Sequence, residues 1–316
     1  MKRRSFINTS SSALLGLSAL GLGACSDLLS EEVALNLVQE ALPANMPFKI
    51  SLAQWSLNNS LWSGKLDNLD FAKYTKETFA IDAVEYVNQF FIDKAKDTAY
   101  LSQMNQRAED HGVSNQLIMI DMEGSLASLD EKSRLQAVDN HYKWVDAAKF
   151  LNCHTIRVNA AGKGERKAVA NAAVDSLGRL SEYGAKEGIN VVVENHGGYS
   201  SDASWLAGVM KEVNMANCGT LPDFGNFTIN LFPRKTYDPL KGLKELMPFA
   251  KGVSAKSHDF NSMGENTHAD FSAMIDIVKE FGYTGHVGIE YEGYKLSEEA
   301  GIKATKDLII KSALGS

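Results

Sequence analysis

The sequence predicts an α/β fold, a (β/α)8 TIM barrel, and three observations lead to it. Eight short apolar runs rich in β-branched residues alternate with stretches of helical periodicity over about 250 residues. Several helical stretches end in a glycine, which can take the left-handed conformation that stops a helix. Four consecutive runs end in charged or imidazole side chains. A doubly wound open sheet is the alternative, but Gly162-Lys163-Gly164 lacks the third glycine of a dinucleotide-binding loop.

The predicted strands are short enough to be barrel strands, and we expect their carboxyl ends to meet at one mouth. The stretch Ser128-Leu129-Asp130-Glu131 is predicted to be a capping box that begins the helical segment after the third strand. No antiparallel edge is expected. The eight strands are predicted at Phe48–Trp55, Ile81–Val87, Ser114–Asp121, Thr155–Ala160, Asn190–Asn195, Cys218–Asp223, Gly252–His258 and His286–Tyr291.

Residues 1–24 are predicted to be a signal peptide that takes no part in the fold. A basic head with the twin arginines Arg3 and Arg4 precedes an apolar stretch that is too short to anchor stably in a bilayer. The sequence Leu22-Gly23-Ala24-Cys25 resembles a bacterial lipobox, in which Cys25 would be lipidated and become the first mature residue. A transmembrane anchor or a soluble export signal is the alternative.

This N-terminus predicts an exported protein that is lipid-anchored in the bacterial cell envelope, in the periplasm or at the outer membrane. Residues 25–46 are expected to form a tether and a short helix, and residues 47–316 the barrel domain. No apolar run beyond the signal is long enough to span a membrane. Membrane contact is therefore expected only through the lipid.

The net charge and the cysteine content argue against a nucleic-acid-binding protein and against a site or framework built on cysteines. The net charge of −7 argues against binding to nucleic acid. The chain has three cysteines, and Cys153 and Cys218, the two beyond the lipobox, suggest neither a disulfide framework nor a thiolate metal site. The sequence leaves the oligomeric state open.

Polar chemistry recurs at the ends of the last four predicted strands. From Glu194 to Asp223, to Lys256 and to Glu290 the steps are 29, 33 and 34 residues, the length of one βα unit. A charged group at the end of a buried strand is costly unless it is paired or binds a metal. Carboxylates with at most one imidazole suit Mn²⁺, Mg²⁺ or Co²⁺ better than a thiolate-type zinc site.

This order of a glutamate, an aspartate, a basic or imidazole residue and a second glutamate resembles the sugar phosphate isomerase/epimerase family of xylose-isomerase-like TIM barrels. The resemblance covers roughly residues 48 to 310. It implies a divalent metal ion (Mn, Mg, Co or Zn) held by Glu194, Asp223 and Glu290 with one further ligand. It also implies that Glu194 and Glu290 are the acid/base pair of a reaction through an enediolate.

The seventh strand departs from the family pattern, which commonly reads His-x-Lys-Asp. Aligned on Asp259, the histidine position falls on Lys256, and His258 comes two residues later on the same side of a strand. We expect His258 to complete the metal site and Lys256 to be catalytic. The competing possibility is that His258 lies past the mouth and that Lys256 replaces the lost ligand by its charge alone.

Three further residues are candidate substrate contacts. Asn226 stands where sugar epimerases often have a histidine, which suggests a changed contact. His196 follows the fifth strand and is expected to touch the substrate, or else to bond to loop backbone. Arg157, on the fourth strand, is expected to hold a substrate oxygen, or else to pair with Glu194.

The favoured function is a divalent-metal-dependent isomerase or epimerase of a sugar or sugar derivative, with an unphosphorylated substrate because of the predicted export. One alternative is a lyase or hydratase that acts on a keto-sugar or glycoside by β-elimination. Another is a sugar-binding lipoprotein with a decayed site. Endonuclease-like chemistry on the same barrel needs a histidine-rich zinc cluster and a basic face, and this chain has neither.

Overall fold

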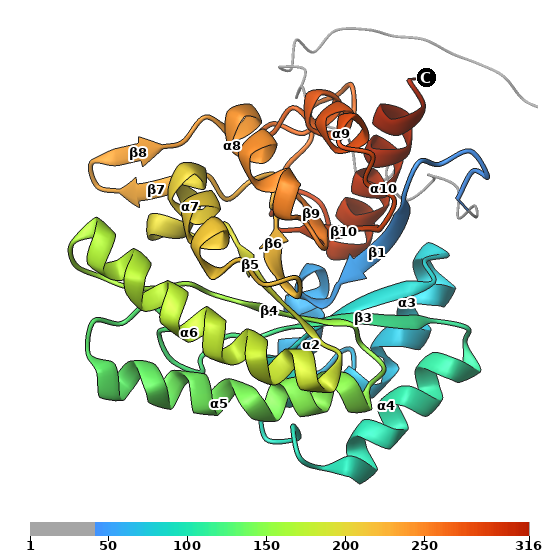
Figure 1. The fold of residues 1–316 in the computed structure, drawn as a ribbon. Coiled ribbons are helices and arrows are strands. Elements are labelled where there is room, and N and C mark those ends of the chain that lie inside the picture. Colours follow the sequence, from blue (N-terminus) through green and yellow to red (C-terminus); the bar gives the residue numbers. More distant parts are fainter. Residues whose placement is uncertain (1–41, 316) are drawn as a thin grey trace, which may run out of the picture.

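The computed structural model describes residues 42–315, which form a ring of eight parallel strands with helices around it (Figure 1). The strands are hydrogen-bonded in the order β6-β5-β4-β3-β2-β1-β10-β9. The (β/α)8 prediction is confirmed. The strands are β1 (Lys49–Ala53), β2 (Ala83–Val87), β3 (Ser114–Met119), β4 (Thr155–Val158), β5 (Asn190–Glu194), β6 (Cys218–Leu221), β9 (Val253–Ser257) and β10 (His286–Tyr291).

The ring closes between β6 and β9 through isolated contacts rather than a regular ladder. Thr220 bridges Ala250 and Asp223 bridges Ser254, both in parallel. The amide of Phe224 donates to the carbonyl of Ser254 at 3.0 Å. Asp223 and Ser254 therefore sit opposite each other in the seam where the barrel closes.

Each strand is followed by helix, as a parallel barrel requires. The longest helices are α5 and α6, which lie side by side on the outside of the sheet (Figure 1). The α-helices are α2 (Asn58–Trp62), α3 (Phe71–Phe79), α4 (Thr98–Asp110), α5 (Glu131–Phe150), α6 (Arg166–Glu187), α7 (Ala203–Val213), α8 (Pro239–Leu246), α9 (Phe271–Glu280) and α10 (Glu298–Leu314).

Helix α5 begins later than the sequence predicts. Its N-cap is Asp130, whose carboxylate accepts a hydrogen bond from the amide of Ser133 at 2.8 Å. Ser128 instead accepts from the amide of Asp130 at 3.3 Å, outside the helix. The predicted capping box is therefore wrong, because the N-cap is Asp130, two residues after Ser128. The Asp130 carboxylate, rather than the Ser128 hydroxyl, caps the first turn of the helix.

Apolar side chains fill two regions. The larger cluster lies between the sheet and the helices, and it includes the fully buried Trp144 of α5. The smaller cluster consists of inward-facing strand residues of the barrel. Since strand side chains alternate, the same strands supply both clusters. The smaller cluster contains Ala53, Val87, Leu117, Met119, Val192 and Leu221.

Two local features differ from the predicted strands. An antiparallel hairpin, β7 (Thr228–Leu231) and β8 (Arg234–Thr236), follows β6 and projects from the body (Figure 1). Its signal in the sequence, a short alternating run before Phe232-Pro233, is weak. Strand β9 ends at Ser257, so that His258 lies just beyond the strand in which it was predicted.

The predicted signal peptide and Cys25 lie outside the described residues, as does most of the tether. Within residues 42–315, no helix combines the length and apolarity that a membrane span requires. Cys153 and Cys218 are free thiols there.

Candidate active site

Three carboxylates from three strands converge at the mouth of the barrel. Glu194 ends β5, Asp223 follows β6 and Glu290 lies in β10. Each offers one oxygen such that the three oxygens lie within 4.8 Å of one another. The residues are at most 4 % exposed. We call these three residues the acidic triad; the structure brings them together as the spacing in the sequence suggested.

Asp223 is fixed by backbone and by one hydroxyl. Its Oδ1 accepts hydrogen bonds from the amides of Gly225 and Asn226, both at 2.8 Å. The Ser254 hydroxyl lies 2.7 Å from Asp223 Oδ2 and 3.0 Å from Glu290 Oε2. Because one hydroxyl proton serves one acceptor at a time, Ser254 links the two carboxylates without satisfying both.

Glu194 is held between an amide and a guanidinium. Asn226 Nδ2 donates to Glu194 Oε1 at 3.0 Å. Arg157 Nε lies 2.9 Å from Glu194 Oε2, while its Nη1 donates to Asp121 Oδ1 at 2.9 Å. The Nε contact misses hydrogen-bond geometry, which leaves Glu194 Oε2 buried without a hydrogen-bond partner. Arg157 thus makes the pairing with Glu194 that the sequence left as its alternative role.

Glu290 is paired with Lys256 across neighbouring strands. The register of β9 and β10 sets the two residues side by side. Lys256 Nζ lies 3.0 Å from Glu290 Oε1 and 2.9 Å from Glu292 Oε1. The Lys256 side chain is 2 % exposed, whereas the Glu292 side chain is 30 % exposed. A line of opposite charges therefore runs from the surface to the acidic triad.

The pKa shifts show which charges are compensated. Burial acts to lower the pKa of Lys256, but the surrounding carboxylates, Glu290 first, outweigh it and raise that pKa well above its usual value. Burial acts to raise the pKa of Glu290, but Lys256 outweighs it and the pKa is lowered. Burial raises the pKa of Asp223 well above its usual range, since Lys256 compensates only in part while Glu194 and Glu290 add repulsion.

These residues fit a divalent cation. The donor atoms are carboxylate oxygens, which hard cations such as Mg²⁺ and Mn²⁺ prefer. Glu194 Oε2 is buried without a hydrogen-bond partner, although Arg157 Nε lies 2.9 Å away, and the raised pKa of Asp223 marks a carboxylate whose charge Lys256 compensates only in part. A cation among the three oxygens would satisfy both.

The structure does not bring His258 into this group of ligand atoms among the residues it describes. The imidazole is half-buried beyond the end of β9 and lies against the ring of His268, with centroids 4.4 Å apart. Its Nδ1 is 3.4 Å from the carbonyl oxygen of Glu292. The inward position that the sequence assigned to a ligand is held by Lys256.

His196 and Asn226 line one cavity of about 480 Å³ beside the acidic triad. His196 is exposed at the rim, and its backbone amide donates to Ser200 Oγ at 2.9 Å. Asn226 is half-buried with its amide turned toward Glu194. These two predicted substrate contacts therefore line the same cavity.

Sequence reasoning missed Ser254 and Glu292. Each lies two residues from a predicted site residue, Ser254 before Lys256 and Glu292 after Glu290. Because side chains alternate along a strand, a spacing of two places them on the same face. This alternation is the signal in the sequence that could have identified both residues.

Glu85 lies deeper in the barrel. Its Oε1 accepts a hydrogen bond from Ser51 at 2.5 Å, and its Oε2 is buried without a hydrogen-bond partner. A Cβ at position 288 would stand 2.5 Å from Oε1, so Gly288 is needed to leave room for the carboxyl group. Burial raises the pKa of Glu85 to about 7.

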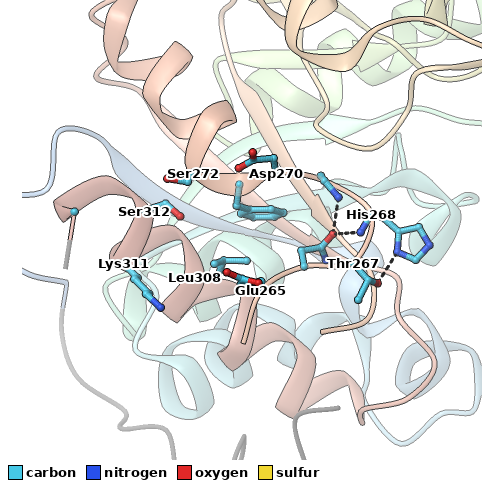
Figure 2. A pocket seen from close by; sticks show the side chains of 12 residues that line it. Glu265, Thr267, His268, Asp270, Ser272, Leu308, Lys311 and Ser312 are labelled. Atoms are coloured by element: carbon cyan, nitrogen blue, oxygen red, sulfur yellow. Dashed lines mark hydrogen bonds between the residues drawn. The ribbon is translucent and has the colours of Figure 1, made fainter. Parts of the chain in front are cut away.

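A larger cavity of about 730 Å³ lies away from these groups, between the loop after β9 and α10 (Figure 2). Its wall includes Glu265, His268, Asp270 and Lys311. Asn266 Oδ1 accepts from the amide of His268 at 2.9 Å, and Thr267 Oγ1 lies 3.0 Å from His268 Nδ1. No residue of the acidic triad lines it, so size alone does not mark the reactive centre.

Comparison with known proteins agrees with this architecture. The family described as xylose isomerase-like TIM barrel matches residues 76–312. A search of curated proteins finds no match.

Among solved structures, the chain is similar to a sugar phosphate isomerase/epimerase from Parabacteroides distasonis, with 15% identity and a TM-score of 0.66 over 88% of this chain and 99% of that chain. A 3-keto-D-glucoside 4-epimerase from E. coli shares 14% identity, with a TM-score of 0.61 over 84% of this chain and 99% of that chain. The IolI protein, solved with a bound zinc atom, shares 16% identity, with a TM-score of 0.64 over 85% of this chain and 99% of that chain.

The family match spans more than half of the sequence, and the eight-stranded barrel with its mouth-facing carboxylates has the corresponding form. This chain belongs to the xylose isomerase-like TIM barrel family.

Proposed function

We propose that this protein is a divalent-metal-dependent isomerase or epimerase of a sugar or sugar derivative. The observation that carries the proposal is the convergence of Glu194, Asp223 and Glu290, with oxygens within 4.8 Å, at the mouth of the barrel. Structural neighbours include sugar epimerases, which supports this class of substrate. The acidic triad would hold the metal ion.

Two of the three carboxylates are suited to opposite halves of a proton transfer. Glu290 is kept ionised by Lys256 and can accept the proton of a carbon next to a carbonyl group. Glu194, on β5, is oriented by Asn226 and Arg157. When its carboxyl group is protonated it can give that proton to the reacting carbon from its own side, and exchange with solvent then resets both carboxyl groups. When bound, the metal ion would polarise the substrate carbonyl and stabilise the negative charge that develops on it. Return to the same carbon from the other face inverts the centre, and transfer to the neighbouring carbon isomerises the sugar.

Lys256 can donate a hydrogen bond to a substrate oxygen that gains negative charge. Its ammonium is buried beside Glu290, where water does not compete. The same group could protonate a leaving oxygen, which is the step that a lyase or hydratase needs. Elimination from a keto-sugar or glycoside is therefore the second candidate function.

The charge of the site favours an unphosphorylated substrate. Five carboxylates, including Glu292 and Asp121, surround two cations, Arg157 and Lys256, and both cations are already paired. We propose that His196 and Asn226, which line the same cavity, contact the hydroxyl groups of the sugar.

Hydrogen–deuterium exchange tests the proposed chemistry. The purified protein with Mn²⁺ is incubated in D₂O with ketoses and with 3-keto-sugars, and proton NMR follows the C–H next to the carbonyl group. We expect exchange or epimerisation with the parent protein and with Glu212→Gln, an exposed change on α7. Glu290→Gln should lose at least about a hundredfold, as removal of an acid/base group does. Release of a fragment from a glycoside would establish elimination instead, and absence of exchange with every sugar would contradict both enzymatic functions.

We also propose that the protein is exported and lipid-anchored through Cys25. The support is the twin-arginine head and Leu22-Gly23-Ala24-Cys25. Cys25→Ser should yield an unprocessed or released protein, whereas the parent should carry lipid on its first mature residue. Mass spectrometry of the N-terminus decides, and an unmodified N-terminus elsewhere would refute the anchor.

A further inference from the structure

The fourth inward position around the acidic triad is held by an amine rather than by a metal ligand. Lys256 Nζ approaches Glu290 Oε1 at 3.0 Å and Glu292 Oε1 at 2.9 Å, and the side chain is 2 % exposed. An ammonium has no lone pair to offer a metal ion. Within residues 42–315, the ligand atoms gathered here are those of three carboxylates alone.

The fold makes room for this lysine. A Cβ on residue 225 would stand 3.2 Å from Lys256 Cδ, so Gly225 lets the stem of the lysine cross the mouth beside Asp223. The loop that carries Gly225 is itself tied to Asp223 by its amide at 2.8 Å. Glu292 holds the other side of the ammonium. Lys256 is therefore held by its contacts with Gly225, Glu290 and Glu292, unlike a mobile lysine at the surface.

We propose that Lys256 is a resident cation of the acidic triad that competes by its charge with a divalent ion, so that the protein by itself holds the ion weakly. The proposal rests on the metal site of the proposed function. A positive charge beside three carboxylates offsets part of the attraction that they exert on a second cation. The ion then depends on additional oxygens, which a hydroxy-ketone substrate supplies, so metal and substrate are expected to bind together.

Isothermal titration of chelator-treated protein with MnCl₂ tests this directly, without any measurement of activity. Lys256→Met removes the charge and keeps the length of the stem, and it should bind Mn²⁺ at least about tenfold more tightly than the parent, since a like charge within about 4–6 Å shifts such an equilibrium by that much or more. Lys256→Gln, which also keeps a hydrogen-bond donor, should change in the same direction and serves if the methionine variant does not fold. Lys295→Met is the control, because Lys295 stands at the same end of the barrel but pairs with Asp259 at 3.9 Å. Its affinity for Mn²⁺ should stay within about twofold of the parent.

The outcomes separate the inference from the proposed function. Equal or weaker Mn²⁺ binding by both Lys256 variants, with measurable binding by the parent, overturns the resident cation and leaves the metal site standing. If neither the parent nor the variants bind Mn²⁺, the metal site fails and this inference fails with it. Tighter binding by Lys295→Met to the same extent would show a general charge effect and would also overturn the inference.

Discussion

At the scale of single residues, the site depends on which side chain reaches the inside of the mouth from β9. Ser254 and Lys256, two residues apart, both point inward, and the strand ends at Ser257. His258 falls one residue past that end, where its ring meets His268 rather than the acidic triad. Because β9 ends one residue before His258, the chain does not place an imidazole nitrogen among the ligand atoms of the acidic triad.

Replacement of His258 by alanine tests this placement. We expect His258→Ala to bind Mn²⁺ within about twofold of the parent, because its imidazole is outside the group of ligand atoms. Asp223→Asn, which removes a ligand charge from the same site, should weaken Mn²⁺ binding by at least about tenfold. Calorimetric titration gives both numbers. A His258→Ala variant that loses the metal ion would restore histidine as the fourth ligand.

Glu85 predicts a dependence of stability on pH in the metal-free protein. Its pKa is raised from 4.5 to about 7 in the folded chain, so the folded state binds the proton more tightly than the unfolded state. Stability from this group is complete below pH 4.5 and is lost as the pH rises through 7, by about 3 kcal/mol at most. Urea unfolding at pH 6 and pH 8 should show about 1 kcal/mol of this fall in the parent, and a smaller fall in Glu85→Gln. An equal fall in both proteins would assign the pH dependence to other groups.

At the scale of helices and strands, the strand ends of the site could be predicted from the sequence, whereas the hairpin and the pairing between strands could not. Glu194, Asp223 and Glu290 could be predicted because each closes an apolar strand, and apolar runs are a strong signal. The hairpin β7–β8 could not, since its residues are half-buried or exposed and show little periodicity. The pairing of Lys256 with Glu290 depends on strand register, which one sequence does not contain.

The start of α5 offers a direct test at this scale. Asp130→Ala should lower the free energy of unfolding by about 1 kcal/mol, because its carboxylate caps the amide of Ser133. Ser128→Ala is the matched control, and we expect a change within about 0.5 kcal/mol, since the hydroxyl that it removes accepts from a loop amide at 3.3 Å, outside the helix. Denaturant unfolding followed by circular dichroism measures both. The reverse order of the two losses would support the capping box that the sequence suggested.

At the scale of the whole molecule, the acidic triad joins strands on both sides of the seam that closes the barrel. Glu194 lies on β5, Asp223 beyond β6 and Glu290 on β10, while Asp223 meets Ser254 of β9 by a bridge. Repulsion among the three buried carboxylates acts at the place where the ladder is least regular. A cation among them should therefore stabilise the whole fold as well as the site.

Thermal unfolding with and without metal measures this coupling. A ligand that binds only the folded state contributes about 2.7 kcal/mol at a hundred times its dissociation constant. For a domain of this size that corresponds to an increase in Tm of about 4–8 °C between EDTA and Mn²⁺. Glu290→Gln removes one ligand charge and should lose most of that increase, while its Tm in EDTA should fall below that of the parent because the buried Lys256 loses its ion-pair partner. An equal increase in Glu290→Gln would mean that Mn²⁺ stabilises the protein from some other place, and the acidic triad would then not be the metal site.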